Sequence, residues 1–409
     1  MVDEMDPKAT VETELGGDAS NPYGHIADNY GPRRACFVTG HGATLLDDRG
    51  RSYIDFLGGI AVVSLGHSNP VINAALKKQS ESLWHVSNYF HNQHAARLAD
   101  LIDSKIASAV PGKVFFCNSG AEANEAAIKL ARRFGGEKRY RIIAAEGGFH
   151  GRTMGALAAT GQPSKQIPFA PMLDGFDHVR FGDSKAIRAA VTDQTVAVLL
   201  EPIQGEAGVI DPPEGYLEEV RAICDEYGLL MILDEVQSGL CRTGEWFAFQ
   251  HTKAEPDVVL LAKALGNGIP IGAMWAKEQV MASFIPGDHG TTFGGGALAT
   301  AVGVAVIEEM DRLELNDVVR LTSKRLRSAL MEMPLVKELS GKGLLVGVEL
   351  ERPVADEFVG LAMQRGLVVS KTSTTRLRLA PPLVITDSEL QEGLGVFEEV
   401  ASEFTDVNS

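Results

Sequence analysis

The chain reads Val258-Val259-Leu260-Leu261-Ala262-Lys263-Ala264-Leu265-Gly266-Asn267-Gly268 where a short apolar run meets a lysine and then a glycine-bearing turn. Such a run is typical of a buried strand, and lysine is rarely buried unless it is paired or used covalently. Burial disfavours the charged amine and frees the lone pair that condenses with an aldehyde. Alternatively, Lys263 lies just past a strand end and extends its ammonium group to water. This stretch alone leaves both interpretations open.

A second apolar run, Leu229-Leu230-Met231-Ile232-Leu233, is followed directly by Asp234. This aspartate would stand at the carboxyl end of a buried parallel strand, where open α/β sheets place ligand-binding groups. Pyridoxal phosphate needs a lysine for its aldehyde and a carboxylate that keeps its ring nitrogen protonated. Asp234 could instead be an ordinary helix N-cap. Taken together with Lys263, it favours the cofactor.

The composition excludes several classes of protein. The 409 residues suggest two domains, and 45% hydrophobic with 22% charged residues is typical of a soluble globular chain. The net charge of −16 argues against nucleic acid or an anionic membrane as partner. The cysteines show no metal-ligand spacing and are too few for a disulfide framework: Cys36, Cys117, Cys224 and Cys241. With neither a signal peptide nor an apolar run long enough to span a membrane, we expect a cytoplasmic protein.

From Lys113 onward, apolar runs alternate with helical patterns, which predicts a mainly parallel sheet joined by right-handed crossovers. Before that point, residues 43–57 read as a hairpin around Asp47-Asp48-Arg49-Gly50. The expected strands are Val114–Cys117, Arg141–Ala145, Val196–Leu200, Leu229–Leu233 and Val258–Leu261. The expected helices here are Val71–Leu83, Gln93–Ile106, Ala121–Phe134 and Tyr216–Tyr227.

After Gly296 the pattern becomes mixed α+β and indicates a smaller domain. Helices are expected at Leu298–Leu313, Val318–Met331 and Ala355–Arg365, and strands at Leu344–Leu350, Leu367–Ser370 and Arg376–Leu379. Thr386 and Glu389 predict a capping box for a last helix. We therefore expect a loose tail over 1–20, a segment over 21–65 that completes the small domain, a large domain over 66–296, and the rest of the small domain over 297–409.

Two glycine-bearing stretches suit phosphate binding. Phe115-Phe116-Cys117-Asn118-Ser119-Gly120-Ala121-Glu122 joins a strand to a helix, whose first N–H groups favour an anion. His289-Gly290-Thr291-Thr292-Phe293-Gly294-Gly295-Gly296 adds two hydroxyls to a glycine-rich turn. A plain strand-to-helix turn and a flexible loop are the alternatives.

Further loops carry groups that could bind a ring or a carboxylate. In Phe149-His150-Gly151-Arg152-Thr153, the phenylalanine could stack on a planar ring and the arginine could hold a carboxylate. In Glu201-Pro202-Ile203-Gln204-Gly205-Glu206, carboxylates again follow an apolar run. The alternatives are a packed phenylalanine, a solvated arginine and structural caps. The histidines His85, His91 and His94 match no familiar zinc pattern, so no metal is expected.

Together and in this order, the blocks resemble the class III (subgroup II) pyridoxal-phosphate aminotransferases of fold type I, most closely those that act on acetylornithine. The resemblance runs from Asn29-Tyr30-Gly31-Pro32 to Arg378-Leu379-Ala380-Pro381-Pro382-Leu383 and so covers nearly the whole chain. It implies a large domain with a mainly parallel central sheet flanked by helices, and a smaller α+β domain. It also implies pyridoxal 5′-phosphate as cofactor.

The resemblance implies cofactor roles for matching residues. Lys263 would hold the cofactor covalently and then move a proton, and Asp234 would pair with the ring nitrogen. Gln237 would contact the ring hydroxyl and Phe149 would stack on the ring. Thr292 would reach the partner's cofactor across a homodimer interface. The full set of implied cofactor-binding residues is Ser119, Gly120, Ala121, Phe149, Asp234, Val236, Gln237, Lys263 and Thr292.

The same resemblance implies a substrate site that serves two substrates in turn. Arg152 would bind the α-carboxylate of acetylornithine, and Arg378 that of glutamate or 2-oxoglutarate. Glu206 would pair with Arg378 while the longer donor occupies the site. Thr291 and Tyr30 would lie near the substrate.

The expected activity is a ping-pong transfer of the δ-amino group of N2-acetylornithine to 2-oxoglutarate, as in arginine biosynthesis. Ornithine, 4-aminobutyrate and succinyl-diaminopimelate are alternative donors, because differences of one or two groups in a pocket decide between them. An aminomutase of the glutamate-1-semialdehyde type and a non-catalytic relative are rivals from other classes. The pair of arginines speaks against the first, and the presence of Lys263 and Asp234 against the second.

Two positions depart from the family pattern. Asn267 stands where the family often has glycine, and Gly296-Ala297 replaces the usual Asn-Pro. The first adds a side chain beside the lysine turn, and the second would loosen the loop that carries Thr292.

Overall fold

The computed structural model describes residues 25–30, 33–106 and 108–404. Contacts along the backbone divide the chain into a unit over Met1–Cys36 and a compact unit over Phe37–Ser409. In the first unit the described residues form turns and bends without a helix or strand. The expected tail over 1–20 lies outside the described residues, and the domain boundaries near 65 and 296 stay predictions.

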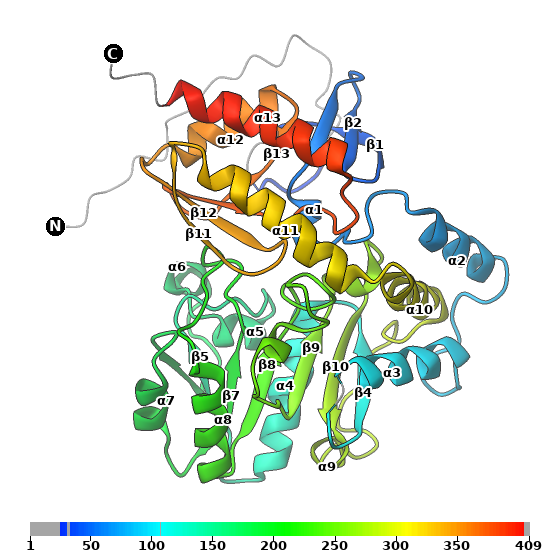
Figure 1. The fold of residues 1–409 in the computed structure, drawn as a ribbon. Helices are drawn as coiled ribbons and strands as arrows, with labels where there is room; N and C mark the ends of the chain where they lie inside the picture. The colour runs from blue at the N-terminus through cyan, green and yellow to red at the C-terminus, as the bar shows by residue number, and fades with distance from the viewer. Residues whose placement is uncertain (1–24, 31–32, 107, 405–409) are drawn as a thin grey trace. The chain divides into compact units, whose positions relative to one another are not determined.

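A seven-stranded sheet forms the centre of the second unit (Figure 1). Five of its strands run parallel as neighbours, and only β10 is antiparallel to the strands beside it. In sheet order the strands are β4 (Gly112–Cys117), β10 (Gly272–Lys277), β9 (Val258–Leu261), β8 (Leu230–Asp234), β7 (Thr195–Leu200), β5 (Arg141–Ala145) and β6 (Phe176–Val179).

The sequence did not predict β10, and its direction follows from a short connection. Residues 262–271 alone join β9 to β10, whereas a parallel neighbour needs a crossover of a dozen or more residues. The chain therefore turns back after Lys263 and places Trp275, which is fully buried, between β4 and β9.

The two faces of this sheet are buried in separate cores because strand side chains alternate. Met231 and Leu233 of β8 share a core with residues of α8 (Tyr216–Tyr227). Leu230 and Ile232, which point the other way, share a second core with the alanine-rich side of α4 (Gly120–Gly135). Helices thus cover both faces, as a mainly parallel sheet requires.

Further helices surround this region. They are α2 (Pro70–Ser80), α3 (Gln93–Ile106), α5 (Met154–Ala159), α6 (Pro163–Gln166), α7 (Ser184–Ala190), α9 (Glu278–Met281) and α10 (Ala297–Arg312). The 3-10 turns are η1 (Ile167–Phe169), η2 (Ala248–His251) and η3 (Lys263–Gly266). Among the described residues, no helix has the length and apolar character needed to cross a membrane.

Two four-stranded sheets lie apart from the seven-stranded sheet within the second unit (Figure 1). The helices beside them come mostly from the C-terminal part of the chain. One sheet contains β1 (Phe37–His41), β2 (Thr44–Asp47), β3 (Ser52–Asp55) and β13 (Leu367–Val368). The other contains β11 (Val336–Ser340), β12 (Val346–Leu350), β15 (Arg376–Leu379) and β14 (Ser370–Lys371). The helices are α1 (Gly58–Ala61), α11 (Leu315–Met331), α12 (Ala355–Gln364) and α13 (Asp387–Glu403).

Residues near both ends of the described chain meet in this region. β2 and β3 form the expected hairpin, and β3 pairs in parallel with β13, so that Ile54 faces Leu367. The expected capping box is present, because Thr386 accepts from the Glu389 N–H and the Glu389 carboxylate accepts from the Thr386 N–H. Residues 52–55, before position 65, therefore share a sheet with a strand from the C-terminal part of the chain.

Candidate active site

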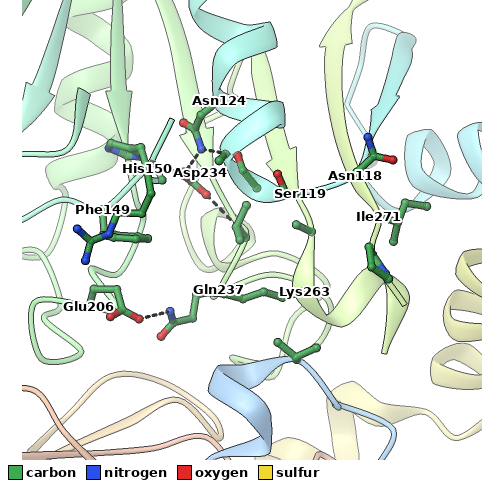
Figure 2. A pocket seen from close by; sticks show the side chains of 18 of the residues that line it. Asn118, Ser119, Asn124, Phe149, His150, Glu206, Asp234, Gln237, Lys263 and Ile271 are labelled. Carbon is green, nitrogen blue, oxygen red and sulfur yellow. Dashed lines mark hydrogen bonds and ion pairs between the residues drawn. The ribbon is translucent and has the colours of Figure 1, made fainter. Parts of the chain in front are cut away.

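Lys263 and Asp234 meet because their strands are neighbours. β8 and β9 are parallel, and both residues lie at the carboxyl ends of these strands. Both line one cavity of about 410 Å³. Figure 2 shows Asn124 of α4, Asp234, Lys263 and the loop residues Phe149 and Glu206 around it. The two runs that the sequence analysis joined are therefore joined in space.

Asp234 is a buried carboxylate held from two sides. The side-chain amide of Asn124 donates to its Oδ2 over 2.8 Å, and His150 Nδ1 lies 2.9 Å from the same oxygen. The Val236 N–H donates to Oδ1 over 3.1 Å. Only 4% of Asp234 is exposed, so these contacts fix its orientation within the cavity wall.

His150 adds charge to this arrangement. Burial lowers the pKa of His150, but the hydrogen bond to Asp234 and the negative charges of Asp234 and Glu201 outweigh burial and raise it overall. Its Nε2 is buried and has no hydrogen-bond partner among the described residues.

Glu201 is a third buried ionisable group beside the cavity. It accepts hydrogen bonds from the N–H groups of Phe149, over 2.9 Å, and Gly205, over 3.2 Å. Burial raises its pKa to about 7, although the positive charge of His150 opposes this. Glu201 therefore anchors the loop that carries Phe149, while its own charge depends on pH near neutrality.

The amine of Lys263 forms no hydrogen bond or ion pair with the residues that the structure describes. Burial lowers its pKa, and so does the charge of Arg378, against the opposing effect of Glu206 and Asp234. Its backbone has a φ of +44°, in the left-handed region that non-glycine residues rarely adopt. A lowered pKa and the lack of a partner are the properties of a nucleophilic amine.

Asn267 holds the lysine turn in place. Its Oδ1 accepts from the Leu65 N–H over 2.8 Å, and its Nδ2 donates to the Gly66 carbonyl over 3.1 Å. Its φ of +45° also lies in the left-handed region, which asparagine tolerates better than most residues. The asparagine that departs from the family pattern thus ties the turn to the segment after α1.

The start of α4 forms the opposite wall. Ser119 is the N-cap and accepts from the Glu122 N–H over 3.2 Å, while the N–H groups of Gly120 and Ala121 have no acceptor within the helix. A Cβ at Gly120 would lie 3.0 Å from the side chain of Val236, so Val236 would have to shift by a few tenths of an ångström to accommodate it. These N–H groups make an anion site at the helix N-terminus.

Arg378, Glu206 and Gln237 form a polar cluster at the cavity. Arg378 is 4% exposed, and its Nη1 donates to Glu206 Oε1 and, over 3.2 Å, to Gln237 Oε1. Gln237 in turn donates to Glu206 over 3.3 Å. Burial raises the pKa of Glu206, but the charge and hydrogen bond of Arg378 lower it overall. The pair is an ion pair that a substrate carboxylate could replace.

Phe149 and Arg152 lie on the loop after β5. The Arg152 guanidinium is 5.8 Å from the centre of the Phe149 ring, and both side chains line the cavity. A Cβ at Gly151 would come within 2.7 Å of the Ala121 side chain, so this loop packs closely on the start of α4. Arg152 is exposed and makes no ion pair within the described chain.

Three residues of the second unit that the sequence analysis assigned to the site do not line this cavity, namely Arg378, Thr291 and Thr292. Arg378 reaches it through Glu206 and Gln237, which do line it. Thr291 reaches it indirectly, because its Oγ1 accepts from Asn118, a cavity residue, over 3.2 Å. Thr292 lines a second cavity of about 320 Å³. Tyr30 belongs to the N-terminal unit and is 83% exposed.

The loop that carries Thr292 is held by two asparagine side chains. Asn88 donates to the carbonyls of Thr291 and Gly294, and Asn92 donates to that of Gly295 over 2.9 Å. The unusual Gly296 serves as the N-cap of α10. These hydrogen bonds restrain the loop without the family's usual Asn-Pro pair.

Sequence reasoning gave no role to Asn124 and His150. One signal was present for Asn124, because a polar residue stands among the alanines of the buried face of α4, where asparagine is unfavourable. No comparable signal existed for His150, since its contact with Asp234 depends on the packing of a loop against a distant strand.

Comparison with known proteins identifies the class that this fold and site define. The chain belongs to the class-III aminotransferases, whose family profile matches residues 25–401. It is 45% identical over 387 residues to the acetylornithine aminotransferase of Caldanaerobacter subterraneus subsp. tengcongensis. The aligned region covers 93% of this chain and 98% of that protein.

Solved structures agree with this assignment. The fold is similar to that of N-acetylornithine aminotransferase from Stenotrophomonas maltophilia, with a TM-score of 0.80, 36% identity, and coverage of 92% of this chain and 98% of that one. It is also similar to ornithine aminotransferase from Toxoplasma gondii, described with partial occupancy of pyridoxal phosphate at its active site. For that structure the TM-score is 0.89 and the sequence identity is 32%, and the match covers 94% of this chain and 93% of that chain. The fold is therefore fold type I, and the enzyme depends on pyridoxal phosphate.

The residues present fit this cofactor. Within the described part of the chain, the cavity has an amine without a partner, a buried carboxylate oriented by two side chains, and free N–H groups at a helix start. These correspond to the aldehyde, the ring nitrogen and the phosphate of pyridoxal phosphate. The half-buried Phe149 adds an aromatic ring to the lining of the same cavity.

Proposed function

We propose that this enzyme transfers the δ-amino group of N2-acetylornithine to 2-oxoglutarate, giving N-acetylglutamate 5-semialdehyde and glutamate, as a step of arginine biosynthesis. One observation carries the proposal: the cavity of Lys263 is lined by Arg152, which has no ion pair among the described residues, and by Glu206, which is paired with a second arginine, Arg378. The name of the Caldanaerobacter relative supports the same donor.

In this proposal the cofactor is held at four points. Lys263 attaches it covalently, Asp234 keeps its ring nitrogen protonated, and the N–H groups of Gly120 and Ala121, with Ser119, bind its phosphate. Gln237 contacts the ring hydroxyl, and Phe149 and Val236 cover the ring. When bound, pyridoxal phosphate supplies an aldehyde that exchanges amino groups and a ring that accepts electrons. Lys263 also removes a proton from the carbon that bears the amino group and returns it after the transfer, for which a lowered pKa suits it.

The two arginines would let one cavity serve two substrates. Arg152 binds the α-carboxylate of N2-acetylornithine, whose length brings the δ-amine to Lys263. During that half-reaction Glu206 neutralises Arg378, so no buried charge is left unpaired. A glutamate or 2-oxoglutarate carboxylate then displaces Glu206 from Arg378. Thr291 would adjoin the substrate through Asn118, and a role of Tyr30 in substrate binding stays a prediction from the sequence.

We further propose a homodimer in which Thr292 reaches the phosphate of the partner's cofactor. Thr292 is exposed on a restrained loop and lines a cavity separate from that of Lys263. Large exposed side chains accompany it on neighbouring segments, namely Trp84, Tyr89, Phe90 and Phe293. Exposed apolar groups gathered in this way favour an interface with another chain.

We also propose that the enzyme works in the cytoplasm. All four cysteines are free thiols, three of them buried, and they form no disulfide within the described residues. Such cysteine usage suits a reducing compartment.

A panel of amino donors tests the activity. The holoenzyme is mixed with N2-acetylornithine, ornithine, 4-aminobutyrate or N-succinyl-diaminopimelate, and conversion of the cofactor to its aminated form is followed by absorbance. We expect the highest kcat/KM with N2-acetylornithine and restoration of the spectrum by 2-oxoglutarate. Preference for another donor, or turnover of glutamate 1-semialdehyde without 2-oxoglutarate, would overturn the proposal.

A further inference from the structure

A buried arginine outside the proposed set joins the loop after β8 to the strand that carries Arg378. Arg242 lies on this loop, and only 1% of it is exposed. Its Nη1 donates to the carbonyls of Leu344, over 3.1 Å, and of Pro381. Its Nη2 donates to the Ser64 hydroxyl over 3.0 Å. The guanidinium therefore connects three segments that are far apart in the sequence.

Two of these contacts complete the pairing of β12 with β15. The strands are antiparallel, and Val346 faces Leu379, the neighbour of Arg378. The same register continued by two residues brings Leu344 opposite Pro381. Because proline has no N–H to donate across the pair, the guanidinium supplies the donor for both carbonyls. The two strands are thus held together just beyond Arg378 by a side chain from another part of the fold.

The loop after β8 also contacts Arg378 directly. Gln237, on the same loop, accepts from Arg378 over 3.2 Å and donates to Glu206, the partner of Arg378. Further along the loop, the carbonyl of Arg242 accepts from the Leu344 N–H over 3.0 Å. One loop therefore contacts the side chain of Arg378 and also fixes the end of the strand that bears it.

No carboxylate offsets the charge of Arg242 by direct contact. Among the described residues it forms no ion pair, and its Nε has no hydrogen-bond partner. Burial lowers the pKa of Arg242, and the negative charge of Asp55 opposes this effect. Burial of a cation without a paired anion costs free energy, so stability alone would not favour arginine here. The fork of N–H donors in one plane suits a side chain that joins separate segments.

We propose that Arg242 is a positioning residue that fixes Arg378 for binding the carboxylate of glutamate and 2-oxoglutarate. The inference rests on the proposed function, in which Arg378 binds this carboxylate. Arg242 keeps the end of β15 against the loop after β8, so the Arg378 guanidinium stays beside Gln237 when a substrate displaces Glu206. Binding at Arg152 does not depend on this contact, since Arg152 lies on the loop after β5. Arg242 therefore acts on one of the two substrates of the enzyme.

Single-turnover reactions of the holoenzyme with two amino donors test this role. Glutamate uses Arg378 and N2-acetylornithine uses Arg152, and stopped-flow absorbance gives the maximal rate and the half-saturating concentration for each donor. Arg242→Lys keeps the charge but cannot reach both carbonyls, and Arg242→Met removes every donor. We expect both variants to raise the half-saturating concentration of glutamate by about 10-fold or more, with little change in the maximal rate. That of N2-acetylornithine should rise by less than about twofold.

Arg327→Lys is the matched control. The side chain of Arg327, on α11, also donates to two backbone carbonyls, at the end of β11, and to the hydroxyl of Ser323. None of these partners lies on β15 or on the loop after β8. This variant should therefore react with both donors like the wild type.

The outcomes separate this inference from the proposed function. Equal weakening of both donors in the Arg242 variants, unchanged half-saturation by glutamate, or loss of folding in both variants would overturn the inference. In each of these cases the proposed function stands if the wild type converts N2-acetylornithine. Conversely, a wild type that does not react with N2-acetylornithine, but whose half-saturation by glutamate depends on Arg242 at an unchanged maximal rate, supports the inference and overturns the proposed donor.

Discussion

His150 Nδ1 lies 2.9 Å from Asp234 Oδ2, and both side chains are almost completely buried. Asn124 donates to the same oxygen, so two neighbours fix the position of Asp234. One of the two, His150, also adds positive charge. The carboxylate is thus oriented before any ligand arrives, which is the property required of a group that holds a proton on a ring nitrogen.

The first prediction concerns the charge of Asp234. Asp234→Asn keeps the shape but removes the negative charge, so the ring nitrogen loses its proton and its capacity to accept electrons falls. We expect a loss of about 100-fold or more in kcat for each half-reaction, measured by stopped-flow absorbance. The matched control is Glu235→Gln, at a buried neighbour that accepts from Ser238 and the Phe249 N–H and does not line the cavity. Equal losses in both variants would contradict the role of Asp234.

The second prediction concerns the pH dependence of stability. Burial raises the pKa of Glu201 to about 7, so the folded state binds more protons than the unfolded state between about pH 4.5 and 7. The free energy of unfolding therefore falls as pH rises through this window, by up to about 1.4 kcal/mol per pH unit for one group. Glu201→Gln should flatten this slope.

Urea unfolding at a series of pH values measures the slope. Glu332→Gln, at an exposed glutamate, is the control and should keep the wild-type slope. An unchanged slope in Glu201→Gln would show that another group, such as His150 with its raised pKa, is responsible.

The third prediction concerns the pair of Glu206 and Arg378. Glu206→Gln removes the carboxylate that competes with a substrate for Arg378, so the KM for glutamate should fall several-fold. With N2-acetylornithine, Arg378 would stay buried without its partner, and kcat/KM should fall about 10-fold. Steady-state kinetics with each substrate measures both effects. A change of the same direction and size for both substrates would argue against the switch.

The fourth prediction concerns Asn267 and the lysine turn. Asn267→Gly loses the hydrogen bonds to Leu65 and Gly66 but keeps the left-handed backbone, and should lower the free energy of unfolding by about 1–2 kcal/mol. Asn267→Ala loses the same bonds and adds backbone strain, for a further cost of about 1 kcal/mol. Denaturant unfolding measures both. Asn73→Ala, which removes one exposed 3.3 Å hydrogen bond to Ser68, should have almost no effect. If alanine and glycine at 267 are equivalent, backbone strain is not part of the cost.

Several elements could be predicted from the sequence to the residue. Val258–Leu261 is an uninterrupted apolar run and Arg141–Ala145 is an arginine followed by four apolar residues, and both form strands with these bounds. Tyr216–Tyr227 has apolar residues at helical spacing and is α8. β10 was missed because glycine, alanine and methionine give no periodic signal, and because its strand direction depends on the turn at Lys263. The short strand β6 was missed as well, since its four residues are only half-buried.

The residues of the site also divide into those that the sequence could bring together and those that it could not. Residues that follow the ends of parallel strands, such as Lys263 and Asp234, could be brought together from the sequence, because such ends meet at one edge of a sheet. Asn124 and His150 could not, since their contacts depend on how α4 and a loop pack against β8. The contact of Thr292 with the cofactor of a second copy of the chain stays a prediction, because no local sequence pattern encodes a partner.

The parallel pairing of β3 with β13 has a consequence for biosynthesis on the ribosome. Synthesis proceeds from the N-terminus, and the strands of the seven-stranded sheet all precede residue 278, so they can associate while translation continues. One edge of β3 has no partner strand until residues 367–368 have been synthesised. Glu206 has no partner until Arg378 has been synthesised as well. A nascent chain would therefore expose one unpaired edge of β3, and a Glu206 carboxylate without its arginine, until its last part emerges, and during that interval the edge is open to wrong pairing with another strand.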